Sequence, residues 1–239
     1  MRMIVGFWAL LATVLLAGCA ESSPPAYRYR LTVEVETPEG LKTGSSVIEV
    51  ETRVSGRNSI PTPGAVRFRA RGEAVAVDLP VGKTLFALLW SEKEVDWAGS
   101  IMYLFGPKYS GDDGVRRSIA EMKRNPKLII LPPVKPLGRG GAIRRDGWPM
   151  LVTFGDEADP TSVAKVDPDD LAASFGEGVK LKRITAQITN DPITTGIEKR
   201  LGWLPEYYNR QLSGDRYQML KTKIRDCQRS LALGHLAPT

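Results

Sequence analysis

Residues 27–36 read YRYRLTVEVE, and in this stretch every second residue is apolar. The apolar positions are Tyr27, Tyr29, Leu31, Val33 and Val35. Because successive side chains of a strand point to opposite faces, this alternation predicts a strand with one face on a core and the other in water. One-sided burial of this kind is typical of antiparallel sheets, so the stretch predicts a β-rich fold.

Four further segments that follow this stretch also have strand character. They cover residues 46–54, 66–70, 73–79 and 84–90, with loops at 38–44 and 55–64 that contain glycine, asparagine or proline. Together with residues 27–36 they predict a β-meander of about five strands. The sequence Gly82-Lys83-Thr84 is part of a hairpin turn in this interpretation, because a phosphate-binding loop would need glycine where Val77 stands.

The middle of the chain changes character. Residues 95–105 and 112–124 predict short helices, the second of which ends at Asn125-Pro126. Residues 128–131 predict a buried strand. Residues 132–147 hold three prolines and four glycines and predict a long surface loop.

A second β-rich section begins near Met150. Residues 150–154 alternate in polarity and predict a strand, and residues 179–189 predict another. Val179 and Leu181 share one phase of the alternation, whereas Ile184 shares the other, so we expect a β-bulge near Lys182–Arg183. From Gly214 onward, apolar residues recur at helical spacing and predict a basic C-terminal helix.

The expected fold class is therefore mainly antiparallel β, sandwich-like or meander-like, with a few short helices and a C-terminal helix. An α+β fold is the alternative. The expected domain is one β-rich unit over residues 27–212, with a possible subdivision in the loop 132–147, followed by a helical tail over 213–239.

The N-terminus has the features of an export signal. Arg2 precedes an uncharged apolar run over residues 4–16, which is too short to cross a membrane but suits a signal peptide. The run ends in Leu16-Ala17-Gly18-Cys19. These four residues resemble the lipobox of bacterial lipoproteins.

The resemblance implies that residues 1–18 are a signal peptide and that residues 19–26 are a tether. It also implies that Cys19 carries diacylglycerol, that cleavage occurs before it, and that the new amine receives a fatty acid such as palmitate. Ala20 follows the cysteine, and in Gram-negative lipoproteins the absence of aspartate there favours the outer membrane facing the periplasm. The alternatives are an ordinary secretory signal and a short uncleaved anchor.

The two cysteines and the single histidine restrict the chemistry. With Cys19 acylated, Cys227 is the remaining thiol, so no intramolecular disulfide or cysteine metal site is expected. His235 is the only histidine, which removes a Ser-His-Asp triad and histidine-rich zinc sites. We expect no cofactor.

The carboxylates of residues 156–177 are the candidates that remain. Asp156, Glu157 and Asp159 are weak candidates for a calcium site, because calcium takes several oxygen ligands, although the run lacks the spacing of an EF-hand. The competing interpretation is turn chemistry, with Asp169 or Asp170 capping a short helix over residues 171–175.

Charge is distributed unevenly along the chain. The segment from Arg116 to Arg145, called the basic segment below, holds nine Lys and Arg against one acid, whereas residues 156–177 hold seven acids against Lys165. The basic segment is expected to meet anionic lipid or lipopolysaccharide, since nucleic acid is not a partner for a protein anchored outside the cytoplasm. The alternative is a solvated face that the acidic residues partly neutralise.

Two further observations concern residues 151–208. The segments LVTFGDEADPTSVAKVDPDDL, FGEGVKLKRITAQIT and DPITTGIEKRLGWL are similar to segments of bacterial lipoproteins and exported proteins, a resemblance that implies no activity. Trp203, Tyr207 and Tyr208 either stack on a sugar or form core and corner contacts.

The expected function is a lipid-anchored envelope protein with a binding or structural role, and the alternative is an envelope hydrolase that uses an Asp/Glu pair.

Overall fold

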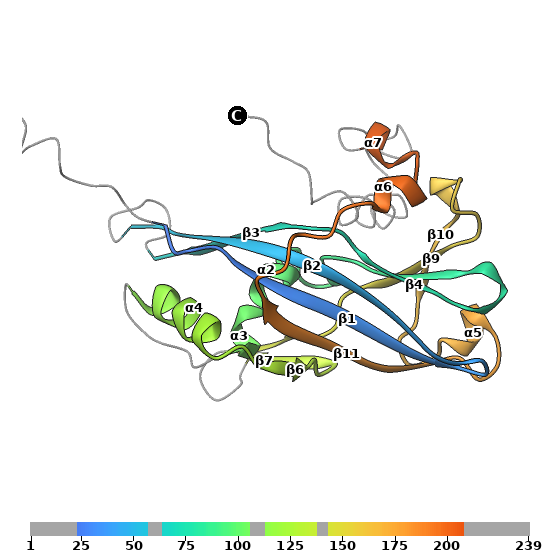
Figure 1. The fold of residues 1–239 in the computed structure, drawn as a ribbon, viewed down its shortest axis with the longest axis horizontal. Helices are drawn as coiled ribbons and strands as arrows, with labels where there is room; N and C mark the ends of the chain where they lie inside the picture. The colour runs from blue at the N-terminus through green and yellow to red at the C-terminus, as the bar shows by residue number, and fades with distance from the viewer. Residues whose placement is uncertain (1–22, 57–63, 106–112, 138–142, 208–239) are drawn as a thin grey trace, which may run out of the picture.

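The fold is mainly antiparallel β with a few short helices, as the sequence predicts (Figure 1). The structure is a computed structural model that describes residues 23–56, 64–105, 113–137 and 143–207. The predicted signal peptide, the predicted C-terminal helix, Cys19 and Cys227 lie outside the described residues. The predicted domain end at residue 212 lies outside them too and stays a prediction.

The longer sheet, called sheet A, has the strand order β3-β2-β1-β11-β6. Its strands are β1 (Tyr27–Thr37), β2 (Gly40–Val54), β3 (Val66–Arg71), β6 (Leu128–Ile130) and β11 (Lys180–Thr189), and all neighbours are antiparallel. The alternating stretch over residues 27–36 lies in β1, the central strand of sheet A.

The alternation of β1 is confirmed by burial. The five apolar side chains of residues 27–35 are at most 2% exposed, and they point to one side of the sheet.

The predicted loop at 38–44 is wrong, because β2 already begins at Gly40. A tight turn closes this hairpin: the Thr37 hydroxyl donates to the Gly40 carbonyl at 2.8 Å, and Gly40 has a φ of 111° that favours glycine.

The predicted bulge in β11 is confirmed. Glu34 lies opposite Arg183 and Val35 lies opposite Leu181, so Lys182 is the extra residue. The bulge shifts the pleat by one residue, and this shift lets both apolar phases of the strand face the core.

The second sheet, called sheet B, corrects the prediction of a five-stranded meander. Its order is β10-β9-β5-β4, with β4 (Val75–Asp78), β5 (Thr84–Ala87), β9 (Leu151–Phe154) and β10 (Val163–Val166). The meander therefore stops after β3. The chain leaves sheet A at Gly72, whose φ of 148° suits glycine, and an added Cβ there would meet Ile48 Cα at 3.1 Å.

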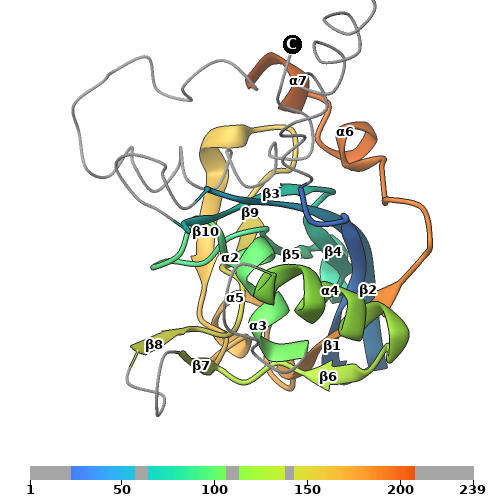
Figure 2. The same cartoon turned by 90° about the vertical axis from the view of Figure 1, so that its left-hand side faces the viewer.

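The long sheet A is covered by two different layers (Figure 1). Sheet B packs on one half, and the helices α2 (Trp97–Ser100) and α3 (Met102–Phe105) pack on the other half. Figure 2 shows both helices inside the curve of sheet A. The predicted helix over 95–105 is thus two short helices, and Trp97 is fully buried between the layers.

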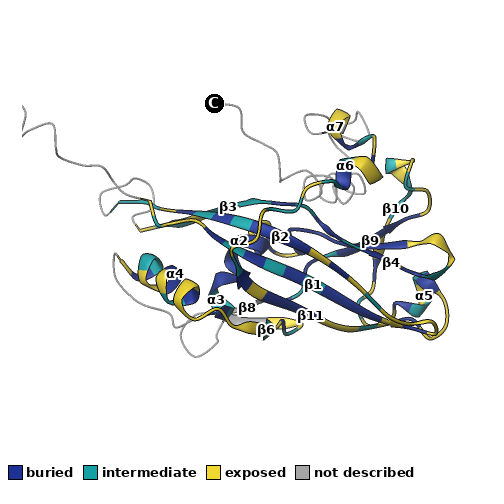
Figure 3. Cartoon of the chain, in the orientation of Figure 1, coloured by how far each residue is buried: buried dark blue, intermediate teal, exposed yellow. Residues whose placement is uncertain are grey.

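The helix α4 (Gly114–Arg124) matches the prediction for residues 112–124 and buries Ile119 and Met122. The predicted buried strand is only partly right. β6 lies at the edge of sheet A with Leu128 and Ile130 exposed, and Leu131 beyond it is buried (Figure 3). An edge strand has one neighbour, so less of its surface is covered.

The predicted surface loop at 132–147 is wrong. The strands β7 (Val134–Leu137) and β8 (Ile143–Asp146) pair as an antiparallel hairpin. Pro136 lies opposite Arg144 in this ribbon. A two-stranded ribbon has only edge strands, where a proline without an N–H is tolerated.

Short helical segments complete the fold. They are η1 (Pro80–Gly82), η3 (Pro160–Ser162), α5 (Ala172–Phe175), α6 (Ile197–Arg200) and α7 (Leu204–Tyr207). Glu73 fixes the start of α6, because its carboxylate accepts hydrogen bonds from the backbone N–H groups of Gly196 and Ile197 at 2.6 and 2.9 Å. The segment after β11 is tied in this way to the connection between β3 and β4.

Candidate functional site

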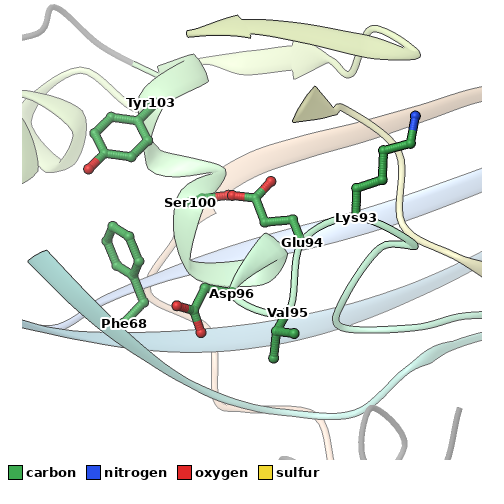
Figure 4. A pocket seen from close by; sticks show the side chains of 7 residues that line it. All are labelled: Phe68, Lys93, Glu94, Val95, Asp96, Ser100 and Tyr103. Atoms are coloured by element: carbon green, nitrogen blue, oxygen red, sulfur yellow. The ribbon is translucent and has the colours of Figure 1, made fainter. Parts of the chain in front are cut away.

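A pocket of about 290 Å³ lies where the loop before α2 meets the edge of sheet A (Figure 4). Small-molecule sites span roughly 300–1,000 Å³, so this pocket has the size of a small ligand site. The residues that line it are Phe68, Lys93, Glu94, Val95, Asp96, Ser100 and Tyr103. They come from β3, the loop 91–96, α2 and α3, which the fold brings together.

The loop 91–96 is held at both ends. The Ser91 N–H donates to the Glu94 carbonyl at 3.1 Å, and the Ala98 N–H donates to the Leu89 carbonyl at 3.2 Å. The Lys93 N–H donates to the Asp146 carboxylate at 3.0 Å, which ties the loop to β8. These bonds hold the backbone of the loop that carries the two acids of the pocket.

The helix α2, which contributes Ser100 to the pocket, is held by buried tyrosines of β1. The Tyr27 hydroxyl donates to the Gly99 carbonyl and the Tyr29 hydroxyl donates to the Ala98 carbonyl, each at 3.0 Å. Burial raises the pKa of both phenols, so they stay protonated donors. The alternating stretch that forms the central strand thereby also positions α2.

Two aromatic rings form one wall. The Phe68 and Tyr103 rings lie 6.0 Å apart at an interplanar angle of 84°, an edge-to-face pair. Gly99 lets this wall approach α2, because a methyl group at Gly99 would overlap Cβ and Cγ of Phe68. The wall therefore depends on a glycine in the helix behind it.

The loop 91–96 contributes two acids to the pocket. Glu94 is 7% exposed, whereas Asp96 lies at the exposed mouth. Partial burial of the Asp96 carboxyl raises its pKa above 3.8, and the Glu94 charge raises it further. Burial also raises the pKa of Tyr103, with a contribution from Glu94. The pocket thus concentrates negative charge next to an aromatic wall.

We expect Asp96→Asn to increase the free energy of unfolding at pH 7. The raised pKa means that the folded protein holds the proton more tightly than the unfolded chain, so wild-type stability falls as pH rises through the interval between the two pKa values. Asparagine does not ionise and avoids this loss. Urea midpoints measured from pH 7 downward should show a gain that disappears below about 3.8, the ordinary pKa of the group.

The matched control is Asp156→Asn. The exposed Asp156 carboxylate accepts a hydrogen bond from the Ala158 N–H in its own turn, an interaction that asparagine can keep. This control should leave the midpoint at pH 7 unchanged. If Asp96→Asn is no more stable than wild type at pH 7, the inference that the ionised Asp96 carboxyl destabilises the folded protein is wrong.

The carboxylates that the sequence put forward lie elsewhere and form turns. Asp159 accepts hydrogen bonds from the N–H and hydroxyl groups of Thr161 at 2.8 and 2.7 Å, and these bonds lower its pKa. Asp170 accepts from the Ala173 N–H at 3.1 Å and caps α5. The turn and cap interpretation is therefore confirmed for these residues.

Among the described residues, no group of three or more His, Cys, Asp or Glu could hold a metal ion, and the calcium site stays a prediction.

Glu157 takes part in a network that the sequence did not reveal. The Thr84 hydroxyl donates to the Glu157 carboxylate, and Arg200 pairs with Asp78 and lies 3.7 Å from Glu157. Arg200 lowers the pKa of the Asp78 carboxyl. This network joins α6 to sheet B, so its role is to hold the end of the described chain.

Trp203 is a corner residue. Its indole N–H donates to the Glu157 carbonyl at 2.7 Å, and its ring contacts Phe154 at a centroid distance of 5.7 Å. This confirms the packing interpretation for Trp203. The Tyr207 side chain and Tyr208 lie outside the described residues.

Comparisons with protein-family models, with curated proteins and with solved structures find no match for this chain. The fold and the pocket therefore define its class: a small antiparallel β protein with an acidic, aromatic-walled pocket. The resemblances to lipoproteins and exported proteins stay predictions. In the part of the chain that the structure describes, no helix is long and apolar enough to cross a membrane.

Proposed function

We propose that this chain is a lipid-anchored binding protein of the bacterial cell envelope and that the pocket around Glu94 and Asp96 is its ligand site. The pocket is the observation that carries the binding role. Its walls come from β3 and from residues 93–103, and they combine an aromatic pair with buried and exposed carboxylates. Such a combination of an apolar wall and a few convergent polar groups is typical of ligand sites.

The anchoring role rests on Leu16-Ala17-Gly18-Cys19 and the apolar run before it. Seven residues separate Cys19 from the first strand residue, Tyr27. A chain of that length spans at most roughly 25 Å. An acylated Cys19 would therefore keep the start of β1 close to the membrane surface, and the absence of aspartate after the cysteine favours the outer membrane facing the periplasm.

Part of the basic segment lies at the same end of the domain. The Lys123 ammonium donates to the Ala26 carbonyl at 3.2 Å, so the last turn of α4 is next to the point where the tether enters the fold (Figure 1). Arg124 and Lys127 are exposed nearby in sequence. Basic residues near an anionic surface contribute about 1 kcal/mol each, and lipid head groups or lipopolysaccharide phosphates are the anions within reach of this end.

An envelope hydrolase is the second candidate. It is favoured by Glu94 and Asp96, which form an Asp/Glu pair in one pocket, and by the raised pKa of the Asp96 carboxyl, since glycosidases use one carboxyl as a general acid. Turnover of an envelope glycan that is abolished by Glu94→Gln would favour this candidate. Saturable binding without product would favour the binding protein.

We expect the protein to be extracted from membranes by detergent and not by salt. Acyl chains hold a protein through buried methylene groups, whose contribution salt does not weaken, whereas the attraction of the basic segment to anions is screened at high ionic strength. Membranes washed with 1 M NaCl should keep the protein in the pellet, and a non-ionic detergent should release it. Release by salt alone would mean that the basic segment, and not a lipid, holds the protein there.

A further inference from the structure

The charged groups around the pocket are not arranged evenly. The Asp96 carboxyl lies beside the Phe68 ring and the Glu94 carboxylate lies beside Ser100, whereas the Lys93 ammonium points away from both acids (Figure 4). Of the three charged side chains that line the pocket, the two acids lie close to α2 and Lys93 extends away from it. Glu94 is only 7% exposed, so its charge acts across a medium that screens poorly.

The aromatic wall suits the same kind of ligand. Phe68 and Tyr103 both line the pocket, their rings pack edge to face, and the face of an aromatic ring is negatively polarised. Cations are attracted to such ring faces, and the attraction is larger where water is excluded. Val95 adds an apolar side chain at the mouth.

We propose that the pocket binds a small organic cation, in which an ammonium group meets Glu94 and Asp96 while a short apolar body lies against Phe68 and Tyr103. This inference rests on the proposed function, since it names the ligand class of the same pocket. The volume of about 290 Å³ has room for about ten groups of the size of a water molecule. A bare metal ion would gain little from the aromatic wall, and the pocket supplies two carboxylates where a calcium ion takes six to eight oxygens.

Three probes of one shape and different charge test the proposal: phenethylammonium, neutral 2-phenylethanol and anionic 3-phenylpropionate. Calorimetric titration of the full chain, lipidated and held in detergent, should give saturable binding of phenethylammonium. The neutral probe should bind at least about tenfold more weakly, since hydrogen bonds to charged groups contribute more than neutral ones. The anionic probe should give no saturable signal.

Variants assign the binding to the pocket. Asp96→Asn should weaken phenethylammonium binding about tenfold, and the control Asp156→Asn should leave it unchanged. Glu94→Gln should weaken it as well. Asp96 lies at the exposed mouth, so its variant keeps the test valid even where the buried Glu94→Gln does not fold.

The other outcomes overturn the proposal in distinguishable ways. If the alcohol binds as tightly as the ammonium and Phe68→Ala abolishes both, the pocket remains a ligand site but its ligand is not a cation. If none of the three probes binds the folded protein, the assignment of this ligand class is wrong. Neither outcome affects the anchoring at Cys19, which acylation tests separately.

Discussion

Gly44→Ala is expected to lower the free energy of unfolding by about 3 kcal/mol, because overpacking at a site that cannot relax reaches this size. Gly44 lies in β2, opposite Val33, where β4 of sheet B approaches sheet A. A methyl group there would overlap the carbonyl oxygen of Ala76 and would lie 3.0 Å from Val77 Cγ2. Backbone atoms of a paired strand cannot rotate away as a side chain can, so the two sheets must separate.

Thermal unfolding measures this effect. For a domain of this size, about 3 kcal/mol corresponds to a decrease in Tm of roughly 6–12 °C. The matched control is Gly202→Ala, since Gly202 is exposed and an added Cβ would have no heavy atom within 4 Å. Equal melting temperatures for Gly44→Ala and Gly202→Ala would show that the sheets do not approach as closely as described.

Local sequence patterns predicted the strands that bury one face in the core and expose the other face. β1 was predicted because its five apolar residues keep one phase, and the bulge at Lys182 was predicted because β11 changes phase at that residue. A cap of α5 by Asp169 or Asp170 was predicted from turn chemistry, and Asp170 provides it. In each case the determining residues lie within a few positions of one another.

Features that depend on distant contacts were missed. The move of β4 and β5 to a second sheet depends on Gly72 against Ile48, and nothing near Gly72 in the sequence shows that contact. The hairpin of β7 and β8 was hidden by prolines and glycines, which a two-stranded ribbon tolerates. Exposure of β6 follows from its edge position, which its apolar composition does not reveal.

The candidate site was missed for the same reason. The acids of Ser91-Glu92-Lys93-Glu94-Val95-Asp96 have the composition of a solvated loop, and the run 156–177 holds more acids. Only the fold brings Phe68 of β3 and Tyr103 of α3 to the loop 91–96. A short acidic run directly before the buried Trp97 was the one local signal that could have indicated a partly buried carboxylate.

Cys19→Ser is expected to abolish acylation and processing of the chain altogether. The thiol is the group that forms the thioether with diacylglycerol, and a hydroxyl is a far poorer nucleophile than a thiolate. Without the lipid, the lipoprotein peptidase has no substrate, so the variant should keep its apolar leader and migrate as a larger species. Cys227→Ser is the matched control, because it removes the other cysteine of the chain and leaves the lipobox intact.

Incorporation of labelled palmitate tests the central claim most directly. In a bacterial host with the lipoprotein-processing enzymes, the wild type and Cys227→Ser should both incorporate label and appear as the shorter mature chain. Cys19→Ser should incorporate none and remain a precursor. A wild type that is cut to mature size without label would contradict the account, because Cys19 would then be an ordinary residue near a secretory cleavage site and the protein would not be lipid-anchored.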